Sequence, residues 1–344
     1  MDLTKAIGNE NEQNTNQATS EGYVRRLYRK PKKVNDYFLG YILGYGQTGT
    51  TYEAEKKGSE DEYVLKLYDK RYTDDKVFQK IQEEEIRLSQ NPAYGLVPIC
   101  NHGVFNGQYY VVRPKIERED SEDYFAHNSN EFHSEYRESC LNDVKKIASS
   151  ILKNLIPLHR DGFVHGNIKK NNIIWNPISD QILLSDYGLN SLKKKSNSMY
   201  DPYQVYYQPC EQVQHPQKPT PSADLFAIGI FMYNSVQVNE PCRDKTDILN
   251  GKLTTTIQKE IAQGIDFKPI KQLLDDDYLA VVGAESFEKL GYDPESDDEY
   301  PEDYEYYNID SQFAEAIDRA IKKEPSERYQ TAEEFLEALD KVIV

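Results

Sequence analysis

A short glycine-rich segment, Gly44-Tyr45-Gly46-Gln47-Thr48-Gly49, has residue types suited to phosphate binding. Glycine lets backbone amides approach a phosphate closely and adopts turns that other residues avoid. The GxGxxG spacing is weak alone, because it also occurs in dinucleotide-binding folds and in plain hairpins. Those folds place a helix directly after the last glycine, whereas residues 50–54 have the pattern of a strand. The spacing therefore favours a glycine-rich hairpin that covers a nucleotide.

A lysine and a carboxylate further along could form a second part of such a site. Lys66 ends the apolar run Val64-Leu65-Lys66 and could reach the α- and β-phosphates of a nucleotide if a carboxylate held it in place. Glu85 is the favoured partner, because apolar residues follow it in a helical rhythm, and Glu84 remains an alternative.

The strongest signal is a run of polar residues that contains His165, Asn167, Lys169 and Asn172 and is followed by Asp186-Tyr187-Gly188. This run resembles the catalytic loop HRDxKxxN and the DFG motif of protein kinases. Three later landmarks agree with that resemblance. Residues 208–211 look like the APE motif, residues 222–229 look like the DxWSxG helix start, and Arg328 is the late arginine that pairs with the APE glutamate, here Glu211.

The resemblance implies a bilobal α+β fold, with a small β-rich N-lobe at residues 35–113 and a larger helical C-lobe at 114–344. It also implies ATP and Mg²⁺ as cofactors. Gly44, Gly46, Gly49, Lys66 and Glu85 would hold the nucleotide, and Asn172 and Asp186 would bind the metal through oxygen. Lys169 would neutralise charge on the transferring phosphate.

Two departures from the kinase pattern bear on function. Asn167 stands where kinases have the aspartate that accepts the proton of the substrate hydroxyl, and an amide has no useful basicity. General-base catalysis contributes about 10²–10⁴ in rate, so we expect phosphotransfer to be severely weakened but not necessarily abolished. Gly166 replaces the arginine of HRD, which in many kinases receives a phosphate on the activation loop.

Smaller departures concern the adenine site and the branch of the family. Thr51 and Val64 replace the usual valine and alanine, and Arg113 falls near the back pocket between the lobes, where it could narrow the adenine site. The Asp-Tyr-Gly triplet and the loop sequence resemble the casein-kinase-like, vaccinia-related branch. The Glu211 and Asp224 regions look more like general serine/threonine kinases.

Three functions are compatible with these residues. The favoured interpretation is a pseudokinase that binds ATP and Mg²⁺ and acts as a scaffold or allosteric regulator of a protein partner that the sequence does not identify. The alternative is a weakly active serine/threonine kinase, or another nucleotide transferase, that lacks the catalytic aspartate. The third is a pure interaction module with a closed, nucleotide-free cleft.

Apolar periodicity predicts the elements that position these residues. Strands are expected at 36–43, 50–56, 62–68, 96–99 and 109–112, and helices at 76–89 and from 141 to a stop at Asp161-Gly162. Residues 1–34 are predicted to be a disordered tail with a basic end, and residues 285–308 an exposed acidic insertion.

Composition excludes several classes of protein. The 344 residues carry 58 acidic and 41 basic side chains, and the formal charge of −17 disfavours broad nucleic-acid binding. The four cysteines form no CxxC pair and predict neither zinc nor disulfides. No apolar run is long enough to cross a membrane, and the N-terminus lacks a secretory pattern, so an intracellular protein, cytoplasmic or nuclear, is expected.

Overall fold

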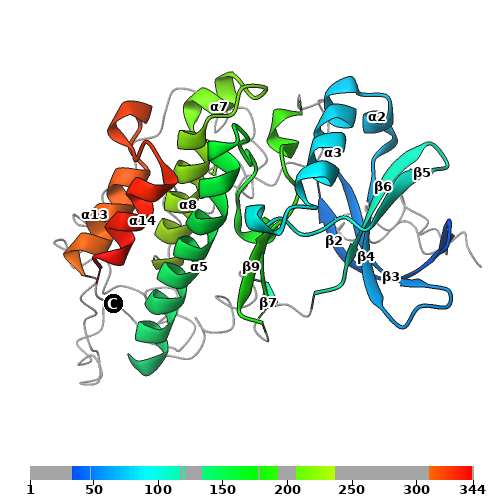
Figure 1. Cartoon of the computed structure of the whole chain (residues 1–344), viewed down its shortest axis with the longest axis horizontal. Helices are drawn as coiled ribbons and strands as arrows, with labels where there is room; N and C mark the ends of the chain where they lie inside the picture. Colours follow the sequence, from blue (N-terminus) through cyan, green and yellow to red (C-terminus); the bar gives the residue numbers. More distant parts are fainter. Residues whose placement is uncertain are drawn as a thin grey trace, which may run out of the picture.

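The computed structural model describes residues 33–46, 48–116, 119–120, 134–176, 179–192, 207–236 and 310–342. Gln47, most of the predicted N-terminal tail and the predicted acidic insertion at 285–308 lie outside these residues. Figure 1 shows a sheet at one end of the molecule and a group of helices at the other, joined by a region of short strands. This is the bilobal α+β arrangement that the sequence predicts.

The N-lobe is built on an antiparallel six-stranded sheet with the order β1-β2-β3-β4-β6-β5. Asn106 and Gly107 join the last two strands with φ angles of 51° and 74°, the positive values that a tight hairpin turn requires. The strands are β1 (Lys33–Val34), β2 (Tyr37–Gly46), β3 (Gly49–Lys56), β4 (Glu62–Tyr68), β5 (Asn101–Phe105) and β6 (Gln108–Pro114).

Helix α3 (Lys76–Leu88) brings a carboxylate to the sheet. Asp75 caps its N-terminus, because the side chain accepts hydrogen bonds from the backbone N–H groups of Val77 and Phe78 at 2.9 and 3.2 Å. One face of α3 is buried, with Phe78, Ile81, Gln82, Glu85 and Leu88 at helical spacing. Glu85 is therefore on the buried face, which is unusual for a charged residue unless it is paired.

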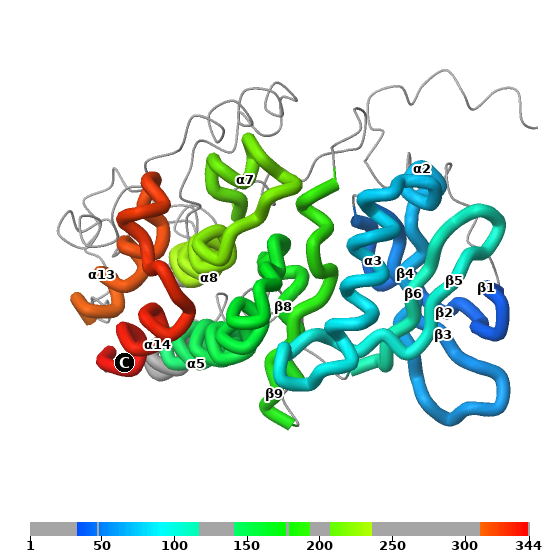
Figure 2. The backbone as a smooth tube through the Cα atoms, turned by 45° about the horizontal axis from the view of Figure 1, so that its top comes forward, coloured from blue at the N-terminus to red at the C-terminus, as the bar shows by residue number. Residues whose placement is uncertain are grey.

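The C-lobe is a helical core with a small second sheet at its border with the N-lobe, as Figures 1 and 2 show. Helix α8 is apolar on nearly all sides and its central residues are fully buried. The main elements are β7 (Glu119–Asp120), α5 (Ser134–Arg160), β8 (Ile173–Asn176), β9 (Gln181–Leu184), α7 (Cys210–Gln214), α8 (Pro221–Val236), α13 (Ser311–Ala320) and α14 (Ala332–Asp340). Shorter helical turns are α2 (Lys70–Thr73), η1 (Pro92–Tyr94), η2 (Lys170–Asn172), η3 (Leu189–Ser191) and η4 (Pro325–Glu327).

Backbone hydrogen bonds join the lobes beside the short sheet. Val97 N donates to Leu184 O at 2.9 Å, and Leu184 N donates to Gly95 O at 2.8 Å. A side chain at Gly95 would collide with Asn154 of α5, because a Cβ there would lie 2.0 Å from the Asn154 Nδ2 atom. The link thus fixes the end of β9, and Asp186 two residues later, against the N-lobe.

Two sequence predictions about elements are wrong. Residues 96–99 do not form a strand; Leu96 makes one isolated bridge to Leu184, and the strand begins at Asn101. The apolar residues at 96–99 are buried between the lobes instead of alternating in a sheet. Lys33 and Val34 belong to β1 and not to a disordered tail, because fully buried Val34 packs in the sheet core.

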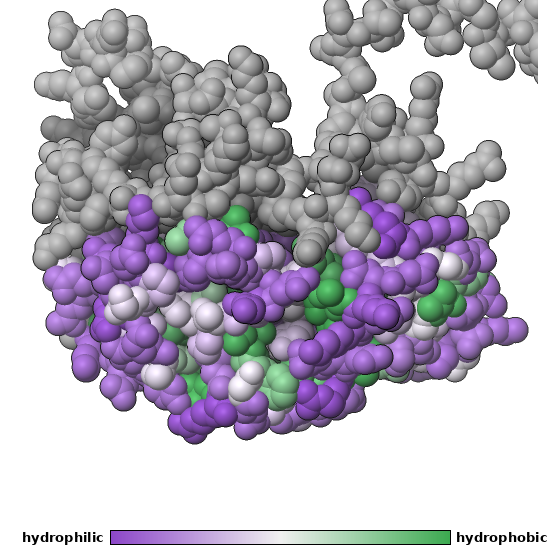
Figure 3. All heavy atoms as spheres, turned by 90° about the horizontal axis from the view of Figure 1, so that it is seen from above, coloured by the Kyte–Doolittle hydropathy of each residue, from purple (hydrophilic) through white to green (hydrophobic). Residues whose placement is uncertain are grey.

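The described surface is mostly hydrophilic in the view of Figure 3, with hydrophobic groups in small separate areas. Large exposed hydrophobic side chains are concentrated on β2 and include Tyr41 and Tyr45. Cys100 and Cys210, the cysteines among the described side chains, carry free thiols. None of the described helices combines the length and apolarity that a bilayer crossing needs.

Candidate functional site

The glycine-rich segment forms the end of the β2–β3 hairpin, where Gly46 pairs with Gly49. At Gly49 only glycine fits, because a Cβ would lie 2.2 Å from the Leu67 carbonyl oxygen of β4. A Cβ at Gly44 would instead meet no atom within 4 Å. The hairpin therefore packs against β4 at Gly49 and leaves open space beside Gly44. This arrangement leaves room for a bulky ligand.

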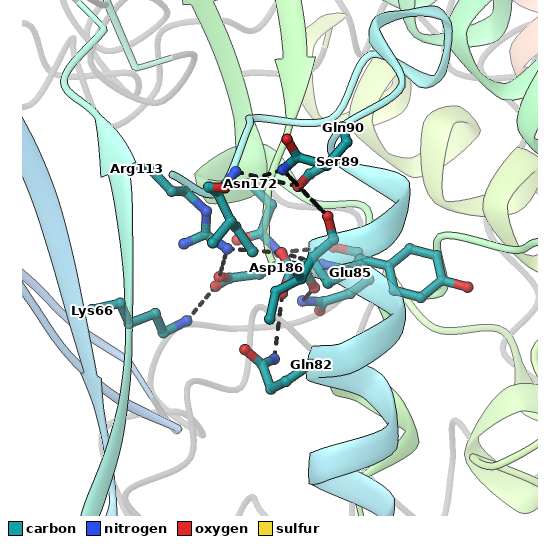
Figure 4. A network of polar contacts seen from close by, with 12 residues as sticks. Lys66, Gln82, Glu85, Ser89, Gln90, Arg113, Asn172 and Asp186 are labelled. Carbon is teal, nitrogen blue, oxygen red and sulfur yellow. Dashed lines mark hydrogen bonds and ion pairs between the residues drawn. The ribbon is translucent and has the colours of Figure 1, made fainter. Parts of the chain in front are cut away.

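Lys66 and Asp186 form an ion pair across the two lobes, and both are largely buried. Lys66 lies on β4 and Asp186 follows β9, so the pair joins the sheet to the C-lobe (Figure 4). The backbone of Asp186 has a φ angle of 61°, in the left-handed region that non-glycine residues rarely adopt. The surrounding contacts hold the carboxylate in this conformation.

The predicted pairing of Lys66 with Glu85 or Glu84 is absent among the described residues. Glu85 is instead bound by Arg113, whose Nη2 atom lies 2.7 Å from Glu85 Oε1. The same Nη2 atom lies 3.5 Å from Asp186 Oδ1. The arginine occupies the place beside Glu85 that the lysine was expected to take, and Lys66 turns to Asp186 (Figure 4).

We call Lys66, Arg113, Glu85 and Asp186 the charged network. Arg113 has a side-chain exposure of 8% and Glu85 of 3%. The second Glu85 oxygen, Oε2, accepts a hydrogen bond from Gln82 Nε2 at 3.3 Å, and Oε1 also accepts one from Tyr187 N at 3.3 Å. The buried carboxylate is thus paired and hydrogen-bonded on both oxygens, as burial of a charge requires.

Burial and charge act in opposite directions on the pKa values of the charged network. Burial raises the pKa of Glu85, and Arg113 only partly offsets this effect. Burial also acts to raise the pKa of Asp186, but Lys66 and Arg113 outweigh it and hold that pKa at about 2. Burial opposes the charge of Arg113, yet Glu85 and Asp186 raise its pKa above the ordinary value. Asp186 and Arg113 are therefore ionised at neutral pH.

Helix α3 also holds the residue after Asp186. The Tyr187 hydroxyl donates a hydrogen bond to Glu84 Oε2 at 2.9 Å. Burial and the Glu84 carboxylate raise the pKa of Tyr187, so the hydroxyl stays protonated and keeps donating. Glu84, the alternative partner of Lys66 in the sequence, thus binds Tyr187 and not the lysine.

Asn167 is almost completely buried and its side chain contacts the backbone of Asp186. Its Nδ2 atom donates a hydrogen bond to the Asp186 carbonyl oxygen at 2.7 Å. A carbonyl can only accept, so this contact requires a donor at position 167, and a carboxylate could not make it. The remaining amide oxygen cannot take up a proton at neutral pH. Asn167 therefore positions the segment that carries Asp186, and its amide has no capacity to act as a base.

The two oxygen donors predicted to bind Mg²⁺ lie in the same region. Asn172 Nδ2 donates to the Asn167 carbonyl oxygen at 2.8 Å, which leaves Asn172 Oδ1 for a cation. Amide and carboxylate oxygens are the ligand types that Mg²⁺ prefers. No cluster of three or more His, Cys, Asp or Glu side chains suited to a metal occurs within the described ranges. The donor types fit Mg²⁺, but Asp186 already faces two cations.

Lys169 contributes to the same electrostatic environment, because its charge also lowers the pKa of Asp186. His165 has no comparable chemical role. Burial lowers its pKa to about 4, so it is neutral at physiological pH, and its Nδ1 atom accepts a hydrogen bond from Asn167 N at 3.3 Å. The histidine therefore shapes the loop backbone.

Asp224 at the start of α8 fixes the backbone of this loop. Its two oxygens accept hydrogen bonds from His165 N at 2.8 Å and Gly166 N at 2.7 Å, and His159 Nε2 lies 2.9 Å from Oδ2. Gly166 has a φ angle of 67°, which glycine adopts without strain. The residue that replaces the arginine of the HRD pattern thus suits the local backbone.

The predicted pair of Arg328 and Glu211 is confirmed. Arg328 Nη1 lies 2.6 Å from Glu211 Oε1, and Nη2 lies 3.2 Å from Oε2, which makes a bidentate contact. Arg328 is 1% exposed and also donates to the backbone carbonyls of Lys322 and Lys323. This contact joins α7 to the segment before α14.

Sequence reasoning missed the role of Arg113 at the charged network. The signal available in the sequence was a basic residue inside the apolar run that forms β6, because a charge in a buried strand needs a buried partner. The Gln82 contact to Glu85 and the Glu84 contact to Tyr187 were missed too. They depend on the rotation of α3 about its axis, which the sequence gives only approximately.

Comparisons with known proteins agree with this geometry. A family model described as the protein kinase domain matches residues 37–339. Calcium-dependent protein kinase 4 of Arabidopsis thaliana is 28% identical over 264 residues, which cover 70% of this chain and 46% of that protein. Serine/threonine-protein kinase Nek10 of Mus musculus is 23% identical over 245 residues, which cover 68% of this chain and 22% of that protein. The chain thus spans less than half the length of these curated relatives.

Among solved structures, the Mycobacterium tuberculosis PknI kinase domain superposes with a TM-score of 0.57 at 15% sequence identity. The match covers 89% of this chain and 95% of that domain. At this identity the likeness concerns the fold, and it agrees with the bilobal arrangement described above.

Proposed function

Because the chain belongs to the protein kinase domain family, we propose that it is a pseudokinase that binds ATP and acts on a protein partner through its conformation. The observation that carries this proposal is the hydrogen bond from Asn167 Nδ2 to the Asp186 carbonyl oxygen. It places a donor where a working kinase needs a proton acceptor. General-base catalysis is therefore absent, and the rate of phosphotransfer should be lower by a factor of about 10²–10⁴.

Nucleotide binding is supported by residues that need no base. The glycine hairpin provides backbone close to open space at Gly44, and the positive charges of Lys66 and Lys169 both act on Asp186. Asn172 Oδ1 and Asp186 provide the oxygen types that would hold Mg²⁺, and a bound cation would supply positive charge for the phosphates. These features support an ATP site without supporting rapid phosphotransfer.

A conformational output is consistent with the ion pair between the lobes. Lys66 and Asp186 come from different lobes, and phosphates that attract Lys66 compete with Asp186 for it. Nucleotide binding would then shift the balance between lobe arrangements by as much as its affinity differs between them. A partner that contacts both lobes would sense this shift.

The test combines a binding and a turnover measurement on the same protein. ATP should raise the melting temperature of the wild type, since a ligand at 100 times its Kd stabilises by about 2.7 kcal/mol. Transfer of radiolabelled phosphate should not exceed that of an Asp186→Asn variant. Asp180→Asn is the matched control, because Asp180 is exposed and its partners within the described ranges, Lys146 and Trp175, lie outside the site.

Two results would contradict the proposal in different ways. The wild type could transfer phosphate in a reaction that Asp186→Asn abolishes and Asp180→Asn does not. That result would establish a weakly active kinase, and one of the relatives described above, Nek10, is named as a serine/threonine-protein kinase. Absence of stabilisation at millimolar ATP would establish an interaction module without a nucleotide.

A further inference from the structure

The charged network is neutral before any ligand is added. Lys66 and Arg113 supply two positive charges, and Glu85 and Asp186 supply two negative charges. A single lysine facing the same two carboxylates would leave one negative charge uncompensated. That excess charge would favour a divalent cation, and here Arg113 removes it.

The two oxygens of the Asp186 carboxylate each face a different cation. Lys66 Nζ contacts Oδ2, and Arg113 Nη2 lies 3.5 Å from Oδ1. A divalent cation bound to Oδ1 would lie close to the guanidinium and would be repelled by it. The donor types at Asn172 and Asp186 fit Mg²⁺, but the charge already present at Asp186 does not.

Arg113 is unable to leave this position or to lose its charge easily. An arginine stays protonated in proteins, and Glu85 binds the guanidinium at 2.7 Å inside the fold. Its backbone lies within the sheet, where Arg113 pairs with Val64 of the neighbouring strand. The positive charge beside Asp186 is thus a permanent part of the N-lobe.

We propose that Arg113 is a built-in counter-cation of Asp186 and makes ATP binding at this site independent of divalent cations. This inference rests on the proposed function, because it concerns the same nucleotide site and names the cation that acts there. The two cations of the network already balance its two carboxylates, so Asp186 brings no excess negative charge that would repel a triphosphate in the absence of a metal.

The primary test uses the full-length wild-type chain. The Kd for ATP is measured by calorimetry in EDTA and again in excess Mg²⁺. The two Kd values should differ by less than about tenfold, which corresponds to about 1.4 kcal/mol. Wild-type protein that binds ATP only with Mg²⁺ would overturn the inference and leave the proposed function standing. Wild-type protein that binds ATP in neither condition would overturn the proposed nucleotide function and the inference with it.

A second variant assigns the effect to Arg113. Arg113→Met alone would leave the buried Glu85 carboxylate without its cation, so Glu85→Gln is combined with it. The double variant removes one charge of each sign and leaves the network neutral, so it tests only the loss of the guanidinium beside Asp186 Oδ1. Mg²⁺ should then tighten ATP binding by about tenfold to a thousandfold, the range over which one close charge shifts the ionisation of a carboxylate. An unchanged ratio of the two Kd values would overturn the role given to Arg113.

The control is Arg160→Met combined with Glu333→Gln. Arg160 and Glu333 form an exposed ion pair that is not part of the charged network. Like the first double variant, this control removes one positive and one negative charge, so it separates a local effect at Asp186 from the loss of an ion pair elsewhere. Its ratio of Kd values should equal that of the wild type, and a shift as large as in the first double variant would contradict a local effect.

Discussion

Replacing Arg113 with methionine should destabilise the fold strongly at neutral pH and far less near pH 5. The change keeps a long side chain in a buried position but removes the guanidinium that lies 2.7 Å from Glu85. Breaking a buried ion pair by removing one partner costs about 3–5 kcal/mol, because the other charge stays buried without compensation. We expect a loss of this size for Arg113→Met at neutral pH.

The pH dependence follows from Glu85. Its pKa in the folded protein is already above the ordinary value because of burial. A carboxyl group with a raised pKa favours the folded state at low pH, and this contribution is lost as the pH rises through the folded-state pKa. Without Arg113 that pKa rises further, because the cation that partly offsets burial is gone. At the lower pH a larger share of Glu85 is protonated in the variant, so most of the lost stability should return near pH 5.

The assay is urea unfolding of wild type, Arg113→Met and the double variant with Glu85→Gln, near pH 5 and near pH 7.5. The double variant should recover most of the loss at both pH values. The new amide has a partner nearby, because Gln82 Oε1 is buried and has no hydrogen-bond donor in the part of the chain that the structure describes, so it can accept one after the Gln82 amide rotates. An equal loss for Arg113→Met at both pH values would refute this reasoning, and so would a loss below about 1 kcal/mol at neutral pH.

Three further predictions concern other contacts and are measured by thermal unfolding. Gly49→Ala should lower the free energy of unfolding by about 1–3 kcal/mol, because its Cβ would collide with the backbone of β4. Gly44→Ala, whose Cβ would meet no atom within 4 Å, should change that free energy by less than about 0.5 kcal/mol. Equal effects of the two substitutions would contradict this packing argument. Arg328→Met should cost about 3–5 kcal/mol through loss of its Glu211 pair, and an unchanged melting temperature would show that the pair contributes nothing. Tyr187→Phe should cost about 1 kcal/mol by removing the hydrogen bond to α3, so a gain in stability would contradict it.

Sequence patterns predicted the strands and helices best where one face is buried and the other is not. The strand at 62–68 and the helix near 76–89 match β4 and α3 because their apolar residues alternate or recur at fixed intervals. The prediction failed at 96–99, where a short apolar run is buried between the lobes without regular pairing. An apolar run indicates burial, and burial alone does not distinguish a strand from a connecting segment.

Contacts between residues of one motif were easier to predict than contacts between motifs. The segment that carries Asn167 and Asn172 folds locally, and the contact of Arg328 with Glu211 followed from the family resemblance. Which cation reaches which carboxylate depends on the distance between two lobes and on the orientation of α3. Those quantities are set by packing across the whole core, so the sequence left Glu84 and Glu85 unresolved and placed Lys66 on the wrong partner.

The contacts of Asp224 also restrict how this molecule can change shape. One carboxylate on α8 binds two successive backbone amides of the loop and a histidine of α5, so it holds these three segments together. Asn167 follows Gly166 directly in that loop, so a large displacement of Asn167 would break these contacts or carry the helical core with it. On the proposed function, a partner that senses the nucleotide would therefore be expected to contact the sheet and α3, which these contacts do not restrain.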